Sequence, residues 1–344
     1  MPAPRCSPSR APGSPVLPNV AGPDVGGPRI PPGRRVVLPG RGTTWVIDVG
    51  EGRPDAPAIV LLHGWTATAA LNWVYCFEPL AEHFRVVALD QRGHGRGIRP
   101  ESRRGFRLED CADDVVALAD VLELGSIIPV GYSMGGPVAQ LTWQRHRDRV
   151  NGLVLCATSR NFRGTERPMI ARAAISGGLT GVAAALRTLP QPVRRAARAG
   201  IVRRRRMLGM PAWAIEEVSR NDPASLLDAG RCLAAFSSAD WIGEVDVPTG
   251  VVITTRDRIV PPGRQYKLAH AIPGASIWPV EGDHDVCVAA PSIFATAVVD
   301  ACQWASGRAV SAPLPAARGD LSGRGGAPAS VRGARPPAPS ASEH

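Results

Sequence analysis

Short apolar runs of four or five residues recur along the middle of this 344-residue chain, and their rhythm constrains the fold more than any other feature. Stretches with apolar residues at three- and four-residue spacing separate most of the runs, as in Leu108–Leu124. This alternation is typical of a parallel sheet covered by helices, because each buried strand is followed by a crossover helix. The predicted strands are Ala58–Leu62, Arg85–Leu89, Ile127–Val130, Gly152–Leu155, Gly250–Ile253 and Ala275–Trp278. The sequence therefore predicts an α/β fold with a mostly parallel, doubly wound sheet.

Two segments depart from this rhythm. Val36–Leu38 and Thr44–Val49 flank a Pro-Gly-Arg-Gly turn, which predicts an antiparallel hairpin at the entry to the sheet. Residues 158–247 carry an Ala-rich helical pattern and no convincing strand, so we expect a helical cap or lid inserted between two strands. The α/β core is then formed by residues 33–157 and 248–306.

Proline is concentrated at the two ends of the chain. Residues 1–32 hold ten of the 34 prolines and residues 307–344 hold six. Segments this rich in proline and glycine rarely bury enough apolar surface to fold, so both are predicted to be disordered tails. The tails carry +2 and +3 of the formal net charge of +10. The remaining +5 is spread over a core of roughly 274 residues, and we predict no nucleic-acid partner.

Cysteine spacing and hydropathy bear on the compartment. The seven cysteines are irregularly spaced and form no Cys-x-x-Cys, which favours reduced thiols over a disulfide framework or a zinc site. No stretch reaches the ~20 apolar residues that cross a bilayer, and the first residues do not form the apolar run of a signal peptide. We therefore expect a soluble, cytoplasmic protein.

A sharp turn with a serine at its apex follows the predicted strand Ile127–Val130. The hexapeptide 131–136 reads Gly-Tyr-Ser-Met-Gly-Gly and leads into a helical pattern, which is Gly-x-Ser-x-Gly in a strand–turn–helix context. A serine projected from such a turn is held in strained backbone geometry, and side chains two residues to either side would collide with neighbouring backbone. The glycines therefore indicate that Ser133 is a nucleophile.

Two further loops follow predicted strands in the same way. His-Gly-Trp at 63–65 follows the first of the six strands, and Asp-Gln-Arg-Gly-His-Gly at 90–95 follows the second. An open parallel sheet presents its ligand site at the carboxyl ends of its strands, so both loops are expected beside Ser133. With the hexapeptide, these loops resemble the α/β-hydrolase fold family over about residues 34–305.

The resemblance implies a catalytic triad in the order Ser, acid, His. Asp257 follows the fifth predicted strand in the position of the acid, and His284 follows the sixth in the position of the base. An imidazole must take the proton of the Ser133 hydroxyl, and a carboxylate must hold the tautomer and stabilise the imidazolium. Asp283 and Asp285 are alternative acids, although a carboxylate next in sequence to a histidine rarely reaches its ring nitrogen.

The resemblance also implies an oxyanion hole formed by the backbone N–H groups of Trp65 and Met134. The Trp65 side chain fits a core position or a pocket wall equally well. His94 is expected to brace its loop. The residues expected to support the loop and the turn are His63, Gly64, Gly131 and Gly135.

The leading functional prediction is a serine hydrolase of carboxylic esters that forms an acyl-enzyme intermediate and needs no metal or organic cofactor. Epoxide hydrolases and haloalkane dehalogenases of this fold carry Asp where this chain has Ser133, which argues against both. A cofactor-free perhydrolase or haloperoxidase, a lactonase or a carbon–carbon hydrolase would use the same triad. A non-catalytic binding module is the alternative from a different class, although such proteins usually lose a triad residue.

The predicted cap contains a strongly basic segment. Residues 194–206 include seven arginines interleaved with apolar residues. One hypothesis is that this segment contacts an anionic membrane surface or an acidic acyl carrier and delivers a lipid-like substrate to Ser133. The alternative is a solvated helix face in a chain whose basic residues are almost all arginine.

Overall fold

The computed structural model describes most of the predicted core and only the ends of the predicted cap. The described residues are 27–50, 56–99, 105–162, 190, 192–193, 196, 211–308 and 314–315. Most of the tails predicted at 1–32 and 307–344 lies outside these ranges, and so do all seven arginines of the basic segment 194–206. The roles assigned to the tails, to the cap and to the basic segment therefore stay predictions.

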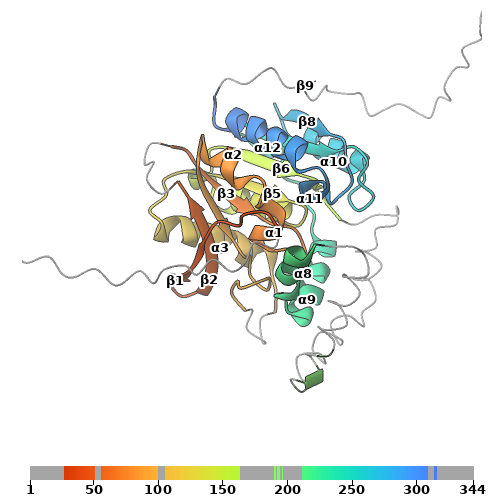
Figure 1. Cartoon of the computed structure of the whole chain (residues 1–344). Helices are drawn as coiled ribbons and strands as arrows, with labels where there is room; N and C mark the ends of the chain where they lie inside the picture. The colour runs from red at the N-terminus through yellow and green to blue at the C-terminus, as the bar shows by residue number, and fades with distance from the viewer. Residues whose placement is uncertain are drawn as a thin grey trace, which may run out of the picture.

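One sheet runs through the described part of the chain, with strand order β1-β2-β4-β3-β5-β6-β7-β8-β9 (Figure 1). Strands β3 to β8 are parallel, whereas β1, β2 and β9 pair antiparallel with their neighbours. The strands are β1 Gly33–Leu38, β2 Gly42–Val49, β3 Ala58–Leu62, β4 Arg85–Leu89, β5 Ile127–Tyr132, β6 Leu153–Cys156, β7 Thr249–Thr254, β8 Ser276–Val280 and β9 Leu314–Pro315. The predicted mostly parallel sheet and its entry hairpin are confirmed.

The order of the parallel strands places the site before any side chain is considered. From β3 the chain steps to β4 on one side, and it then crosses back to β5 and continues through β6, β7 and β8 on the other side. This reversal makes the gap between β3 and β5 a topological switch point, where the loops at the carboxyl ends of the strands diverge and leave a crevice. The loops that follow Leu62 and Tyr132 both lie at this point.

Helices cover both faces of the sheet (Figure 1), and the buried apolar residues of strands β2 to β8 are divided between the two layers. The helices are α1 Ala69–Trp73, α2 Phe77–Ala81, α3 Leu108–Val121, α4 Gly135–Arg145, α8 Ala212–Ser219, α9 Pro223–Ala235, α10 Pro262–Ala271, α11 Val286–Ala289 and α12 Pro291–Ala305, with short 3-10 turns η1 Arg147–Arg149 and η2 Ile242–Glu244. Helices α3, α4 and α10 pack on one face and α1, α2 and α12 on the other.

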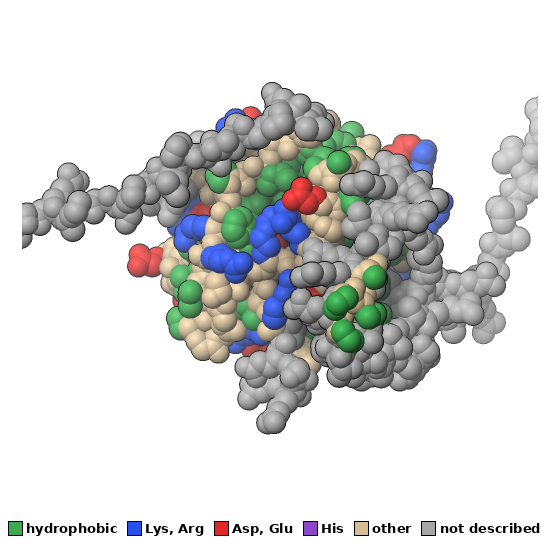
Figure 2. Space-filling model, turned by 60° about the horizontal axis from the view of Figure 1, so that its bottom comes forward, with side chains coloured by type: hydrophobic (Ala, Val, Ile, Leu, Met, Phe, Trp, Pro, Cys, Tyr) green, Lys and Arg blue, Asp and Glu red, His purple; other side chains and the backbone are tan. Residues whose placement is uncertain are grey.

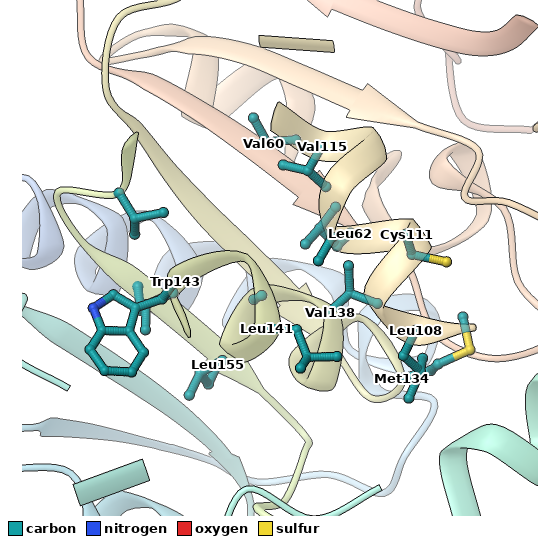
Figure 3. Close-up of a cluster of buried hydrophobic side chains, with 14 of the residues drawn as sticks. Val60, Leu62, Leu108, Cys111, Val115, Met134, Val138, Leu141, Trp143 and Leu155 are labelled. Carbon is teal, nitrogen blue, oxygen red and sulfur yellow. The ribbon is translucent and has the colours of Figure 1, made fainter. Parts of the chain in front are cut away.

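The layer beneath α3 and α4 is a continuous apolar cluster (Figure 3). Val60 and Leu62 point into it from β3, while their neighbours Ile59 and Leu61 point to the opposite layer. Both faces of β3 are therefore buried, and this is why its sequence is an unbroken apolar run. Within the described ranges, no helix combines the length and apolar character that crossing a bilayer requires.

Helices α8 and α9 lie within the described part of the predicted cap, at one end of the sheet, where α8 contacts α1 and α9 contacts α3 (Figure 1). Asp222 caps α9 by accepting a hydrogen bond from the Ser225 N–H, and Pro223 occupies the first turn, where its missing N–H costs little. Ala229 and Leu233 of α9 are buried in the same cluster as α3. These helices are therefore packed on the core rather than projecting from it.

A buried ion pair ties three elements of the core together. The Asp114 carboxylate of α3 is 2% exposed and accepts hydrogen bonds from Arg92 at 2.9 and 2.8 Å and from Arg41 Nε at 2.6 Å. Figure 2 shows that other basic side chains lie on the surface, near the middle of one face of the molecule. The Arg92 side chain, by contrast, is only 11% exposed, and its guanidinium points inward to Asp114. Arg41 lies in the β1–β2 turn and Arg92 in the loop after β4, so Asp114 fixes both to α3.

We expect Asp114→Ala to lower the free energy of unfolding by about 3 kcal/mol, because removing one partner of a buried pair leaves the other charges uncompensated. Urea denaturation measures the change. Asp148→Ala is the matched control, since Asp148 is exposed. An Asp114→Ala protein as stable as the Asp148→Ala protein would contradict this role.

Candidate active site

Ser133 occupies the turn between β5 and α4 in the left-handed backbone region, with φ of +52°. Its own peptide groups are held on both sides. The Ser133 N–H donates to the Cys156 carbonyl at 2.9 Å, and its carbonyl accepts from the Thr158 hydroxyl at 2.7 Å and from the Gly136 N–H at 3.0 Å. These bonds keep a conformation that a residue with a Cβ rarely adopts.

The glycines around Ser133 are required by close backbone approach. A Cβ on Gly131 would collide with the carbonyl oxygen of Gly135, and a Cβ on Gly135 would collide with the carbonyl oxygen of Leu62. Gly136 packs against the Thr158 side chain, which leaves no room for a Cβ there. The turn is therefore packed directly on the end of β3.

Three of the predicted site residues form one line of hydrogen bonds. His284 Nε2 lies 2.9 Å from the Ser133 Oγ, and His284 Nδ1 lies 2.8 Å from Asp257 Oδ2. An ionised carboxylate only accepts hydrogen bonds, so Nδ1 carries the proton and Nε2 is left to accept from the serine hydroxyl. The three side chains come from loops after β5, β7 and β8.

Asp257 is fully buried, and every contact that it makes stabilises its anionic form. Its Oδ1 accepts from the backbone N–H groups of Ile259 and Val260, both at 2.8 Å. Its Oδ2 accepts from the Thr254 hydroxyl at 2.7 Å and from the Gln265 amide at 3.2 Å, in addition to His284. Buried carboxylates persist as charges only when hydrogen-bonded in this way.

The two alternative acids lie elsewhere. Asp283 accepts from the backbone N–H and the guanidinium of Arg258 and from the His284 N–H. Burial raises the pKa of Asp283, but these hydrogen bonds outweigh that effect and lower it below the usual value. The Asp285 side chain is exposed at the start of α11 and caps nothing there. Of the three carboxylates, only Asp257 contacts a ring nitrogen of His284.

The loop that carries Trp65 lies directly against the serine. A Cβ on Gly64 would come within 3.2 Å of the Ser133 Cβ, and the Gly64 N–H donates to Asn72 Oδ1 at 2.7 Å. The Trp65 indole donates to the carbonyl of Leu226 in α9 at 2.8 Å, so its side chain joins the core loop to the described cap helices. The Met134 side chain points into the apolar cluster under α3 and α4 (Figure 3).

Two buried histidines brace this loop from behind. The His63 ring accepts from the Gln91 N–H at 2.9 Å and packs edge-to-face on His94, with ring centroids 5.3 Å apart. Burial lowers the pKa of His63 to about 4, although the Gly64 carbonyl opposes the shift. Burial and the neighbouring His63 lower the pKa of His94 to about 3. Both rings are therefore neutral at neutral pH.

Several residues that hold the site carry no sequence signal. Asn72 lies in α1 and Gln265 in α10, where polar residues on a helix read as surface positions. Tyr132 lies inside the hexapeptide, and its hydroxyl donates to the His284 carbonyl at 2.5 Å. No group of three His, Cys, Asp or Glu side chains in the described ranges is placed to hold a metal ion.

Comparisons with known proteins bear on the family and the fold of the chain. A family model described as alpha/beta hydrolase fold matches residues 57–291. The chain is 30% identical to the pimeloyl-[acyl-carrier protein] methyl ester esterase of Chromobacterium violaceum, over 68% of this chain and 87% of that protein. It is 35% identical to the AB hydrolase superfamily protein YisY of Bacillus subtilis over 34% of this chain and 42% of that protein.

A solved structure is similar over a larger share of the chain. The enol-lactonase of Burkholderia xenovorans LB400 superposes with a TM-score of 0.61 at 25% identity, over 78% of this chain and all of that one. Four curated relatives at 35% identity are matched over only 33–42% of their own length. This chain therefore aligns with less than half the length of each of these four relatives.

The neutral histidines make stability depend on pH. An unfolded histidine takes up a proton below a pH of about 6.5, whereas folded His94 does so only near pH 3. The unfolded state then binds more protons, so stability falls as the pH falls through this window. We expect His94→Asn to reduce the slope of unfolding free energy against pH, between about pH 6 and 4, by up to ~1.4 kcal/mol per unit.

Urea denaturation at several pH values measures this slope. Burial raises the pKa of Asp90, which acts in the opposite direction, but Asp90 is present in both proteins and cancels from the comparison. His270→Asn is the control because His270 is exposed, and it should keep the wild-type slope. Parallel slopes for the wild type and His94→Asn would refute the assignment.

Proposed function

Because the chain belongs to the α/β-hydrolase fold family, we propose that it is a serine hydrolase that cleaves carboxylic esters. The observation that carries the proposal is the line of hydrogen bonds from Ser133 through His284 to Asp257, at 2.9 and 2.8 Å. Nucleophile, base and orienting acid are therefore within hydrogen-bond distance of one another.

In the proposed acylation step, Ser133 Oγ attacks the ester carbonyl carbon and its proton passes to His284 Nε2. The buried Asp257 carboxylate stabilises the imidazolium that forms. The carbon–oxygen bond of the ester then breaks, and His284 gives its proton to the leaving alcohol. The acyl group is left on Ser133 as an ester.

Deacylation repeats these steps with water. His284 takes a proton from the water, the hydroxide oxygen adds to the acyl carbon, and the Ser133 Oγ leaves and recovers its proton from the imidazolium. The products are a carboxylic acid and the free enzyme. In both tetrahedral states the carbonyl oxygen becomes an anion, and we assign the backbone N–H groups of Trp65 and Met134 as its donors.

The substrate class is supported by the names of similar proteins. One is an esterase of a methyl ester and another is an enol-lactonase, and a lactone is a cyclic carboxylic ester. A lactone is therefore the second candidate substrate for the same acyl-enzyme chemistry. An aspartate nucleophile, which epoxide hydrolases and haloalkane dehalogenases of this fold use, is replaced here by Ser133.

We expect a fluorophosphonate probe to label the wild-type protein and not Ser133→Ala, because the probe phosphonylates an activated serine. Ser126→Ala is the matched control, since Ser126 is exposed, and it should label like the wild type.

Hydrolysis of p-nitrophenyl acetate should fall by about six orders of magnitude in kcat for His284→Ala and by about four for Asp257→Asn.

Each other outcome points away from the proposal. A folded wild-type protein that resists labelling would contradict it and favour the non-catalytic binding module. Labelling without turnover of any p-nitrophenyl ester from acetate to palmitate would contradict ester hydrolysis while keeping the serine nucleophile, and would favour perhydrolase or carbon–carbon hydrolase chemistry. Near-normal turnover by His284→Ala would remove His284 from the mechanism.

A further inference from the structure

We propose that Glu217, in the last turn of helix α8, and Asn221, two residues beyond the end of that helix, are positioning residues that hold the Trp65 backbone N–H in place for the oxyanion. This inference rests on the proposed function and assigns a part of that chemistry to the cap. The two loops concerned are residues 63–68, after β3, and residues 90–99, after β4. The first loop borders the switch point between β3 and β5, and the second follows β4, the neighbour of β3 on its other side.

Asn221 bridges the two loops with a single side-chain amide. Its Nδ2 donates to the Thr66 carbonyl at 2.8 Å, and its Oδ1 accepts from the Gly95 N–H at 2.8 Å. The residue is 5% exposed, so water does not compete freely for these bonds. One buried amide therefore sets the separation of the two loops at that point.

Glu217 makes a second bridge between the same loops, one helical turn earlier. Its Oε2 accepts from the Thr68 hydroxyl at 2.7 Å, and its Oε1 accepts from Arg96 at 3.1 Å and Arg220 at 3.0 Å. The carboxylate is 5% exposed, and two partly exposed guanidiniums balance its charge. Thr68 also caps α1 through the same hydroxyl, which accepts from the Leu71 N–H.

Trp65 is enclosed by these contacts on both sides. The preceding residue, Gly64, is bonded to Asn72, and the following residue, Thr66, is bonded to Asn221. Thr66 has φ of +66°, a left-handed conformation that costs of order 1–3 kcal/mol for a threonine. Such a conformation persists only where surrounding contacts impose it, so losing the Asn221 bond allows the Thr66–Ala67 peptide to rotate. The N–H of that peptide donates to the Gly64 carbonyl at 3.3 Å, and this carbonyl shares its peptide with the Trp65 N–H.

The Trp65 side chain is held by the same part of the cap. Its indole donates to the Leu226 carbonyl of α9, and a Cβ on Gly230 would lie only 2.7 Å from the indole ring. Asn221 therefore contacts the backbone of the Trp65 loop, α9 contacts the Trp65 side chain, and α8 contacts Thr68, where the loop enters α1. A backbone N–H stabilises a developing oxyanion only when it is held in position beforehand, and these contacts hold the Trp65 N–H in that way.

Asn221→Asp is the sharpest test, because it keeps the acceptor for Gly95 and replaces the donor to Thr66 by an oxygen. We expect kcat for p-nitrophenyl acetate to fall by on the order of tenfold to a hundredfold, as a displaced catalytic group does, with KM little changed. A trifluoromethyl ketone, whose carbon bonds to Ser133 and whose oxygen becomes an oxyanion, should lose affinity by a similar factor. The planar product acetate should not.

A merely structural role would not produce this split. Lower stability alone reduces the folded fraction and leaves the kcat of titrated active sites and the affinity ratio of ketone to acetate unchanged. Glu217→Gln is the second variant and should give the same split, which keeps the test decisive if Asn221→Asp does not fold. Asn151→Asp makes the same chemical change at an exposed position and should behave like the wild type.

Two outcomes would overturn the inference in distinguishable ways. A wild-type protein that labels with fluorophosphonate, together with folded Asn221→Asp and Glu217→Gln proteins of wild-type kcat and ketone affinity, would refute the positioning role and leave the proposed function intact. A wild-type protein that does not label would remove the proposed function, and the positioning role would fall with it.

Discussion

The left-handed backbone at Ser133 is the constraint on which the rest of the site depends. A serine at φ of +52° is stable there only because the turn is held from either end. The strand before it, β5, lies within the sheet, and the helix after it, α4, packs on that sheet. All six residues of β5 are buried, and this burial offsets the local strain. The glycines at 131 and 135 follow from the same geometry, since a Cβ at 131 would collide with the Gly135 carbonyl and a Cβ at 135 with the Leu62 carbonyl at the end of β3. This backbone conformation projects the serine hydroxyl from the end of the sheet toward His284.

Strand pairing, rather than long loops, brings the distant residues together. Ser133 and His284 are 151 positions apart, yet β5 to β8 are parallel neighbours whose carboxyl ends meet at one edge. The loops from there to Asp257 and His284 are short, so the sheet register fixes the separations of 2.8 and 2.9 Å. Polar contacts then make the final adjustment, with Thr254 and Gln265 orienting the acid.

The elements that could be predicted from sequence are those with local signals. Buried parallel strands read as apolar runs, and the six predicted runs match observed strands to within two residues at each end. The glycine spacing around Ser133 is equally local. The supporting residues are different, because Asn72 and Glu217 are polar positions on helices, and their partners lie eight and 149 residues away. Only the tertiary packing of α1 and α8 distinguishes them from surface residues.

The buried polar groups divide the site into two parts with different origins. In the part of the chain that the structure describes, the proton-transfer side is built wholly within the α/β core, by Asp257 and its donors around β7. The side that faces the proposed oxyanion draws on Asn72 from the core but also on Glu217 and Asn221 from the cap helices. Under the proposed positioning role, a change at Glu217 or Asn221 acts on transition-state stabilisation, while the Ser133–His284–Asp257 line, which neither residue contacts, keeps its geometry. Substitutions at these two positions can in this way alter the rate without disturbing the nucleophile.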